Sequence, residues 1–466
     1  MQKIIIKNFG AIAYAEIEIK KILVLIGEQA SGKSTISKLI YFFKTLRDDI
    51  FNQIYQDKQR DYFDENFDVI SVLKEKFYNW FGSTKKLNDF EIKFYFDFEL
   101  DKSLVLSFSQ DKEIQCEFSP IFFDDKFKDL IGESKKFLQS TFLQSTFLQS
   151  TSDTDKLTSH AYKLSYARII SDELNKVFNN CYQVDSLFVI AGRSATVSYS
   201  ELFERELFAS IKIRLQRNNE LPNHLKIQAV DEILMLEFIG KILNNKVYLK
   251  SWENSYSEYQ NSNYILTKKK VFEILKGEYI YENGEEKIIL NSQESIDLRN
   301  ASSGQQEVIR ILQDILVFIT KGLTLLRIVE EPEAHLFPVA QKNLIELLAL
   351  MVNQNDENQL IITTHSPYIL TVFNNLLFAQ RVVDKNPSAE AEVAELIPKE
   401  FWLKAKDFSA YSLGNHFMDK EADYCESIFD IEMGTIEQNY LDEVSEILGG
   451  DFNTLYSIHA RTFRRK

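Results

Sequence analysis

One short stretch constrains the fold of this chain more than any other feature. It reads Gly27-Glu28-Gln29-Ala30-Ser31-Gly32-Lys33-Ser34 and fits the GxxxxGK[ST] pattern at every fixed position. The apolar run 22–26 precedes it, and residues 34–45 after it carry apolar side chains at helical spacing. A strand, a glycine-containing turn and a helix N-terminus in this order direct backbone N–H groups at an anion. The sequence therefore predicts a phosphate-binding loop on an α/β sheet.

The residues of this loop have distinct expected roles toward a nucleotide. Lys33 reaches the β- and γ-phosphates in loops of this kind, and the Ser34 hydroxyl ligates Mg²⁺. ATP and Mg²⁺ are therefore the implied ligands. The residues expected to contact ATP are Gly27, Glu28, Gln29, Ala30, Ser31, Gly32, Lys33, Ser34 and Thr35.

A second pattern places two acids at the end of an apolar run. Residues 325–329 are mostly apolar and lead into Glu330 and Glu331, as in strands whose carboxylates hold Mg²⁺ and orient water beside a phosphate. Glu330 stands where Asp is usual, which lengthens the metal-binding arm by one methylene. We expect Glu330 to act on the metal and Glu331 to act as the catalytic base. Taken alone, the segment would fit a strand capped by solvated acids equally well.

Two further segments, at 301–315 and 361–365, carry patterns that belong with the phosphate-binding loop and the acidic strand end. Small residues at 301–304 lead into the helical pattern of Val308, Ile311, Leu312 and Ile315, which again predicts a helix N-terminus able to bind an anion. Residues 361–364 form a strand that runs into His365. A lone histidine is more often structural, but an open α/β sheet places its chemistry at this end of its strands.

In order, these four segments resemble the Walker A, signature, Walker B and switch-histidine motifs of RecF-, SMC- and OLD-like ABC ATPases. Residues 330–338 look like the EEPExHLxP form of that group, and residues 364–367 look like its THSP form. The signature LSGGQ is matched at Ser303, Gly304 and Gln306, whereas Ser302 and Gln305 depart from it.

The resemblance implies a nucleotide site that two copies of the chain build together. The Walker A face of one copy would bind ATP while Ser303, Gly304 and Gln306 of the other cover the γ-phosphate. Glu331 and His365 would line the point of cleavage. A higher oligomer than a dimer is compatible with this arrangement. A Q-loop glutamine is also implied, and Gln53, Gln56 and Gln59 all stay open for that role.

The predicted fold class is α/β: an ABC-type P-loop NTPase with a mixed sheet, an inserted helical lobe and a small C-terminal region. We expect the N-terminal part of the ATPase domain at 1–118, the helical lobe at 119–270, the C-terminal part of the ATPase domain at 271–384 and the C-terminal region at 385–466. The lobe shows no sustained heptads, so a compact body is favoured over a coiled coil. Its FLQST repeat at 137–151 has a period of five that fits neither helix nor strand, which favours a surface loop over a partner-docking strip.

Composition limits the setting in which the chain acts. A net charge of −15 gives no indication of general DNA binding, although a local basic stripe stays possible. Three widely spaced cysteines indicate neither a disulfide framework nor a zinc site. We expect no membrane span and no signal peptide, and therefore a cytoplasmic location. The basic clusters 268–270 and 461–466 fit a solvated face or tail better than a phosphate site, which stays the alternative for each.

The resemblance also bears on the biological role. Compact ATPases of this type without a fused nuclease resemble the ATPase subunits of anti-phage systems such as PARIS and Septu. That implies a sensor or scaffold that controls a separate effector, such as a nuclease or toxin. A RecF-like ATPase of DNA repair that binds DNA is the alternative, and a scaffold with little ATP turnover is a third. Arg193 lies in a segment like the PAxRS loop of some defence ATPases, with Ile190 where Pro is common, and its role stays open between nucleotide contact, partner contact and an ordinary loop.

Overall fold

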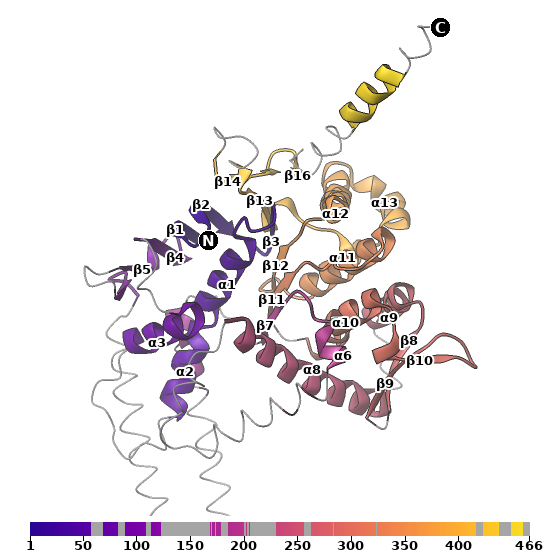
Figure 1. Ribbon diagram of the computed structural model, residues 1–466, viewed down its shortest axis with the longest axis horizontal. Helices are drawn as coiled ribbons and strands as arrows, with labels where there is room; N and C mark the ends of the chain where they lie inside the picture. Colours follow the sequence, from indigo (N-terminus) through magenta and orange to yellow (C-terminus); the bar gives the residue numbers. More distant parts are fainter. Residues whose placement is uncertain are drawn as a thin grey trace, which may run out of the picture. The chain divides into compact units, whose positions relative to one another are not determined.

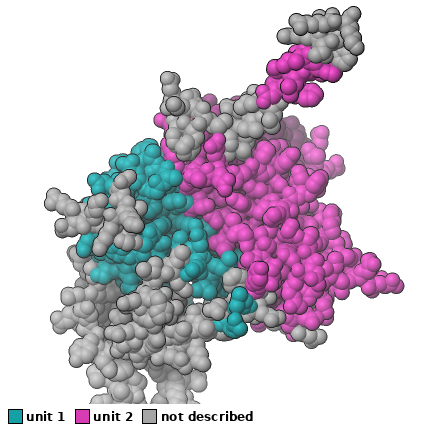
Figure 2. All heavy atoms as spheres, viewed as in Figure 1, with its two compact units in different colours: residues 1–19, 35–188, 200–240 teal, residues 20–34, 189–199, 241–466 magenta. Residues whose placement is uncertain are grey.

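A computed structural model gives the arrangement of the elements in Figure 1. The structure describes residues 1–56, 69–82, 89–108, 113–122, 168, 170–172, 174–178, 185–199, 202, 205, 230–255, 262–282, 284–322, 324–415, 423–437 and 449–459. The FLQST repeat at 137–151, Gln59 and the basic residues 461–466 lie outside these ranges. The chain forms two compact units, coloured separately in Figure 2. Unit 1 comprises Met1–Ile19, Thr35–Phe188 and Ser200–Gly240, and unit 2 comprises Lys20–Ser34, Val189–Tyr199 and Lys241–Lys466.

Unit 1 is built on an antiparallel sheet with the order β2-β1-β4-β5-β6. Its strands are β1 (Gln2–Phe9), β2 (Ile12–Ile19), β4 (Glu91–Asp97), β5 (Lys102–Phe108) and β6 (Ile114–Phe118). Side chains along β1 and β4 alternate between buried and partly exposed, as the period-two sequence pattern predicts. The helices α2 (Leu46–Gln56) and α3 (Val69–Phe81) belong to the same unit. Its core is aromatic, with Phe9, Phe42, Phe77 and Phe90 in edge-on or stacked contact.

Unit 2 contains the sheet that carries the sequence motifs. The order is β14-β13-β3-β12-β11, and β7 (Asp185–Val189), through which the boundary between the units passes, completes it. The other strands are β3 (Ile22–Gly27), β11 (Leu325–Glu330), β12 (Gln359–Thr363), β13 (Phe408–Leu413) and β14 (Cys425–Ser427). The neighbours of β3 and of β12 run parallel to them, and β14 is antiparallel to β13. Every residue of β3 and β11 is buried, as expected for parallel strands covered on both faces.

The strand β13 places part of the predicted C-terminal region inside the ATPase sheet. It pairs with β3 along its whole length, from Phe408 opposite Ile22 to Leu413 opposite Gly27. The expected boundary at residue 384 therefore does not separate an independent region, because residues 408–413 complete the sheet beside the phosphate-binding strand. The two compact units also cut across the four predicted segments.

Helices and a small sheet complete unit 2. The helix α8 (Val230–Ser255) crosses the unit boundary, while α9 (Ser262–Leu275) and α10 (Ser303–Lys321) lie within unit 2 together with the sheet β8 (Glu278–Glu282), β9 (Glu285–Ile289) and β10 (Ser295–Asp297). The strands β8 and β9 pair in antiparallel fashion, with Glu278 opposite Ile289 and Glu282 opposite Glu285. The helices α11 (Pro338–Asn353) and α12 (Pro367–Lys385) contact each other beside the parallel strands (Figure 1). The remaining elements are α1 (Lys33–Lys44), α6 (Ala195–Ser198), α13 (Glu390–Leu396), β15 (Phe429–Asp430), β16 (Thr435–Ile436) and the 3-10 turns η4 (Leu298–Asn300), η5 (Pro387–Ala389), η6 (Lys399–Phe401) and η7 (Ala405–Asp407).

The mixed α/β class predicted from the sequence is confirmed by these sheets and helices. The apolar run 22–26 that precedes the phosphate-binding loop is the strand β3, as the sequence predicts. Among the described residues, no helix is long and apolar enough to cross a membrane.

Candidate nucleotide-binding and hydrolysis site

The phosphate-binding loop connects the end of β3 to the start of α1. Gly27 has φ +151°, and a Cβ atom there would lie 2.5 Å from the Leu413 carbonyl oxygen and 2.5 Å from the Ser31 Oγ. No side chain fits in that space, so the neighbouring strand β13 requires glycine at this position. Ala30 and Gly32 also have positive φ, 64° and 86°. The loop is therefore a tight turn of the kind that directs N–H groups inward.

Lys33 is held by the loop itself in this structure. Its Nζ donates to the carbonyl oxygens of Gly27 at 2.7 Å and Glu28 at 2.8 Å, and the residue is 6% exposed. Burial lowers the pKa of Lys33 to about 8, although Glu331, Glu333 and Glu28 act in the opposite direction. The ammonium group must exchange these carbonyls for phosphate oxygens when a nucleotide binds.

Tyr424 supports the loop from a part of the chain that carries no motif. Its hydroxyl donates to the Ser31 carbonyl oxygen at 2.7 Å, and the side chain is buried. Burial raises the pKa of Tyr424 to about 12, with a smaller contribution from Cys425, so the hydroxyl keeps its proton. Sequence reasoning missed this residue, because a single tyrosine ahead of the short β14 gives no recognisable signal.

Glu330, the last residue of β11, offers an unused oxygen. The residue is 6% exposed, its Oε2 accepts from the Ala191 N–H at 3.3 Å, and its Oε1 is buried without a hydrogen-bond donor. A buried carboxylate oxygen without a donor fits a place in the hydration shell of a cation. The Ser34 side chain at the start of α1 is exposed. Within the described ranges no three His, Cys, Asp or Glu residues cluster as a metal site. A Mg²⁺ ion held by nucleotide phosphates needs only one or two protein ligands.

Glu331 and His365 lie next to each other just beyond β11 and β12. The His365 Nε2 is 3.8 Å from the Glu331 Oε1, and both side chains are partly exposed. Glu331 has φ +43°, an uncommon conformation for a residue with a side chain, and its N–H donates to the Thr363 carbonyl at 2.9 Å. Burial and the nearby Lys33 lower the pKa of His365, against the effect of Glu331, so its imidazole is neutral at pH 7.

Glu333, which sequence reasoning left without a role, organises the histidine loop. Its Oε1 accepts from the Thr364 Oγ1 at 2.8 Å and from the His365 N–H at 2.7 Å. Burial raises the pKa of Glu333, and its Oε2 is buried without a donor. The signal for this role is the acid that follows Pro332 in the EEPE stretch, which ties the turn after β11 to the turn after β12.

The start of α10 has the form of a helix cap. Ser302 is the N-cap, and it forms a reciprocal capping box with Gln305, which explains why Gln305 departs from the signature pattern. Ser302 and Ser303 are exposed. A Cβ atom on Gly304 would lie 2.6 Å from the His335 carbonyl oxygen, so glycine is needed for the close approach of α10 to the turn after β11.

Gln306, the last residue matching the signature, is directed into its own chain. It is 9% exposed, and its Nε2 donates to the carbonyl oxygens of Leu298 at 3.2 Å, Arg299 at 2.9 Å and Ala301 at 3.2 Å. The side chain therefore holds the segment that leads into α10. A role of Gln306 toward the nucleotide of a second copy stays a prediction.

Comparison with known proteins settles the family. The AAA ATPase domain family matches residues 1–370 of the chain. The chain belongs to this family. The match confirms the ATPase domain that the four motifs predicted, and no curated protein matches the chain.

Similar solved structures are heads of SMC proteins. The "SmcHead bound to the C-winged helix domain of ScpA" is 13% identical, with a TM-score of 0.36, over 79% of this chain and 90% of that one. The "SMC head domain from Thermotoga maritima" is 11% identical, with a TM-score of 0.32, over 79% and 90%. The "Smc head domain with an extended coiled coil bound to the C-terminal domain of ScpA" from Pyrococcus furiosus is 14% identical, with a TM-score of 0.31, over 80% and 92%. These TM-scores are too low to support a structural argument.

Arg193 is buried beside the main chain of Glu330 and Glu331. Its side chain is 0% exposed and donates to the carbonyl oxygens of Ile190 at 2.9 Å, Glu307 at 3.1 Å, Glu330 at 2.7 Å and Glu331 at 2.9 Å. The Arg193 Nε is also 3.5 Å from the Glu307 carboxylate of α10. A side chain enclosed in this way has no surface for a nucleotide or a partner. Its contacts fix the end of β11 to α10, called the signature helix below.

Two of the candidate Q-loop glutamines, Gln53 and Gln56, fall in α2, but the structure does not describe their side chains. Gln59 is outside the described residues. The Q-loop assignment therefore stays open.

Proposed function

We propose that this chain hydrolyses ATP, with the catalytic step at the carboxyl ends of β3, β11 and β12. The observation that carries the proposal is the meeting of Lys33, Glu331 and His365, each of which follows a different strand. The three strands are parallel neighbours, with Glu330 opposite Thr363 and Thr363 opposite Leu25. Parallel sheets bring their ligand-binding residues together at this edge.

The chemistry follows from the side chains of the chain itself. Lys33 leaves the loop carbonyls and binds the β- and γ-phosphates, where its positive charge stabilises the charge that develops on cleavage. Glu331 accepts a hydrogen bond from the attacking water and orients it, and the neutral His365 beside it can donate to the γ-phosphate. Ser34 and Glu330 would hold Mg²⁺, directly or through water, and the ion would neutralise phosphate charge.

A second copy of the chain would complete the site. Ser303 is exposed at the first turn of α10, where the helix dipole and unpaired N–H groups favour an anion. This surface suits the γ-phosphate bound to the opposite copy, as the signature resemblance implies. In this arrangement ATP joins two copies into a dimer, and hydrolysis releases them.

Two variants separate ATP binding from ATP cleavage. Lys33→Ala should lower ATP affinity roughly ten- to a hundredfold, because one charge-assisted contact is lost. Glu331→Gln should leave binding intact and lower the hydrolysis rate by about 10²–10⁴-fold. Titration calorimetry and phosphate release measure the two effects, with Glu395→Gln on the exposed face of α13 as the matched control. Wild-type hydrolysis by Glu331→Gln would refute the catalytic assignment.

A mixing experiment tests the shared site. Ser303→Arg should block closure by the opposite copy while leaving ATP binding to its own loop intact. When this variant is mixed with Lys33→Ala, half the dimers are mixed and each has one intact site, so activity should recover to about a quarter of wild type. Full activity of Ser303→Arg alone would contradict the two-copy mechanism.

We further propose that this ATPase is the sensor or scaffold subunit of an anti-phage system that controls a separate effector, such as a nuclease or toxin. The motif resemblance and the net charge of −15 support this role over DNA repair. Plating of bacteriophage on cells that carry the chain with its neighbouring genes tests it, and protection should disappear with Glu331→Gln. Capture of duplex DNA by the ATP-bound protein without any phage protection would instead favour the RecF-like alternative.

A further inference from the structure

A second pocket lies in unit 2 and shares no residue with the nucleotide site. Its volume is about 330 Å³, and residues of α8, α9, β8 and α10 line it, together with Gly277. This volume is within the range of about 300–1,000 Å³ that small-molecule sites occupy. The apolar part of the wall comes from Leu249, Val271 and Leu316, all of them buried.

Lysines give the mouth of the pocket a positive charge. Lys250, Lys268 and Lys269 line it and are exposed, and Glu278 is the one acid in the lining. Lys268 pairs with Glu278 at 3.4 Å. Neither Lys250 nor Lys269 forms an ion pair within the part of the chain that the structure describes. In a protein with a net charge of −15, this local excess of cations favours an anionic ligand.

Aromatic rings stand beside these cations. Tyr264, Tyr281 and Phe272 also line the pocket, and Phe272 is 51% exposed, so its ring is open to a ligand. The Lys268 Nζ lies 5.9 Å from the centre of the Tyr264 ring. Aromatic faces accept planar rings by stacking, and lysine heads hold phosphate as point charges. Together they suit a ligand with a planar ring and a phosphate group.

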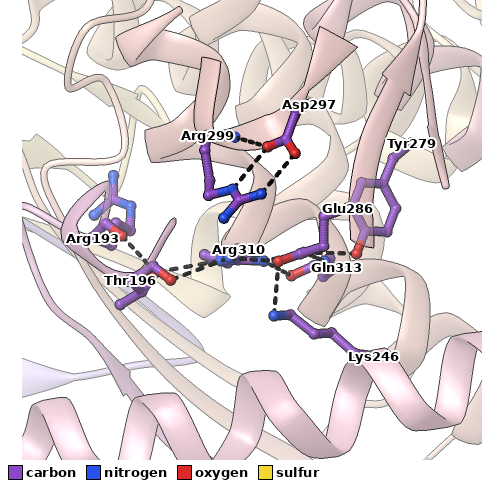
Figure 3. A network of polar contacts seen from close by, with 9 residues as sticks. All are labelled: Arg193, Thr196, Lys246, Tyr279, Glu286, Asp297, Arg299, Arg310 and Gln313. Carbon is purple, nitrogen blue, oxygen red and sulfur yellow. Dashed lines mark hydrogen bonds and ion pairs between the residues drawn. The ribbon is translucent and has the colours of Figure 1, made fainter. Parts of the chain in front are cut away.

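The pocket wall is joined to a buried polar network, shown in Figure 3. Tyr279 lines the pocket and donates from its hydroxyl to the Glu286 Oε1 at 2.8 Å. Glu286 also accepts from Arg310 at 3.0 Å and Gln313 at 3.1 Å, and it pairs with Lys246 at 2.7 Å. Burial raises the pKa of Glu286, but Arg310 and Lys246 outweigh it and hold that pKa at about 2. Glu286 is therefore a carboxylate fixed among cations.

The same network continues toward Glu331, and Figure 3 shows it as far as Arg193. Arg310, on the signature helix, donates from its Nε to the Thr196 Oγ1 and from its guanidinium to the Thr196 carbonyl, both at 3.3 Å. Thr196 in turn donates to the Arg193 carbonyl at 2.6 Å, and Arg193 holds the Glu331 carbonyl at 2.9 Å. Arg193 and Arg310 are 0% and 1% exposed, so the contacts between them are shielded from water.

We propose that this pocket binds a nucleoside monophosphate and that its occupancy changes the rate of ATP hydrolysis. The phosphate lies between Lys250, Lys268 and Lys269, and the base stacks on the rings at the mouth. The ligand presses on Tyr279, and the buried network transmits the displacement to Glu331. The effect on rate rests on the proposed ATPase function, whereas binding to the pocket does not.

A titration of the Lys33→Ala protein decides the binding, because that change weakens competing nucleotide binding at the phosphate loop. AMP, GMP, CMP and UMP are titrated beside adenosine and inorganic phosphate by calorimetry. At least one monophosphate should bind roughly tenfold more tightly than either fragment, and reversal of charge at Lys250 and Lys269 (to Glu) should weaken it roughly tenfold. Reversal at Lys385 and Lys404, two exposed lysines that do not line the pocket, should leave affinity unchanged.

Three outcomes would overturn the binding proposal. They are the absence of saturable binding by all four monophosphates, equal binding by inorganic phosphate or adenosine, and unchanged affinity after charge reversal at the pocket. The melting temperature of each variant shows that it is folded.

Tyr279→Phe tests the coupling, because it keeps the ring in the pocket wall and removes the hydroxyl that contacts Glu286. At saturating ATP, the monophosphate should change the kcat of the wild type by about twofold or more. The Tyr279→Phe variant should bind the monophosphate as tightly as the wild type does, but the bound monophosphate should not change its kcat. An equal response in both proteins would refute the coupling. If the wild type hydrolyses no ATP, the proposed function fails while the titration still decides the pocket.

Discussion

Replacement of Arg193 by Met removes a cation that faces Glu307 and the main-chain carbonyls of Glu330 and Glu331. Met keeps an unbranched side chain but lacks the guanidinium group, so the Glu307 carboxylate, 3% exposed, loses its partner. Breaking a buried pair from one side costs about 3–5 kcal/mol. The backbone carbonyls that lose donors add about 1–3 kcal/mol for each one that water does not reach. With one such carbonyl, we expect a loss of about 4–8 kcal/mol, a large part of the roughly 5–15 kcal/mol that stabilises a typical protein.

Arg193→Lys separates the loss of stability that comes from the charge facing Glu307 from the loss that comes from the carbonyl contacts. The charge near Glu307 is kept, but one ammonium group cannot reach four carbonyls on different segments, so we expect a loss of about 2–3 kcal/mol. The carbonyl of Glu331 is among those released, and the catalytic carboxylate becomes less well positioned. The kcat should therefore fall about tenfold, with little change in the KM for ATP.

Urea denaturation followed by circular dichroism measures the stability loss, and Arg381→Met is the control. Arg381 donates to a carbonyl at the surface, so its removal should cost less than about 1 kcal/mol. The double variant Arg193→Met with Glu307→Met removes both charges and should recover part of the loss. If Arg193→Met were within about 1 kcal/mol of the wild type, the buried contacts of Arg193 would not hold the site, and the reasoning would be refuted.

Three other predictions concern the loop and the signature helix. Bound phosphates should raise the Lys33 pKa from about 8, so ATP affinity should be level below pH 7 and fall as pH rises through 8. Calorimetry in two buffers should detect uptake of about half a proton on ATP binding at pH 8. An absence of proton uptake would contradict this prediction. Gly304→Ala places a Cβ 2.6 Å from the His335 carbonyl oxygen and should lower the free energy of unfolding by about 1–3 kcal/mol, measured in thermal melts. Gly240→Ala is the control: its Cβ would lie in open space on a helix, so it should not lower stability. Tyr424→Phe removes the donor to the loop and should cost about 1 kcal/mol and lower ATP affinity severalfold; unchanged melting and affinity would count against its supporting role.

The sequence predicted those parts of the fold in which the signal is local. The loop from Gly27 to Lys33 is recognisable because its spacing is set by the size of a phosphate and by the turn that surrounds it. Glu331 and His365 were predicted from apolar runs that end in polar residues, and the structure brings them to 3.8 Å from each other. Each of these signals is contained in fewer than ten residues.

Contacts between distant segments could not be predicted in the same way. Tyr424 reaches Ser31 across 393 positions, and no local pattern marks a tyrosine that donates to a remote carbonyl. The sequence left the role of Arg193 open, because its four carbonyl partners come from three segments that only the folded chain assembles. The pairing of β13 with β3 is of the same kind, which is why the expected boundary at residue 384 missed it.

The pairing of β13 with β3 determines when the nucleotide loop is completed during synthesis of the chain. The strand β3 leaves the ribosome early, but one of its two neighbours is β13, whose last residue, Leu413, contacts Gly27 at the phosphate loop. A nascent chain shorter than this has an exposed edge on the strand that carries the nucleotide loop, and its loop lacks one wall. Competence to bind ATP should therefore arise late in translation, after residue 413 has emerged, and an arrested or clipped chain that ends before it should not act as a partial enzyme.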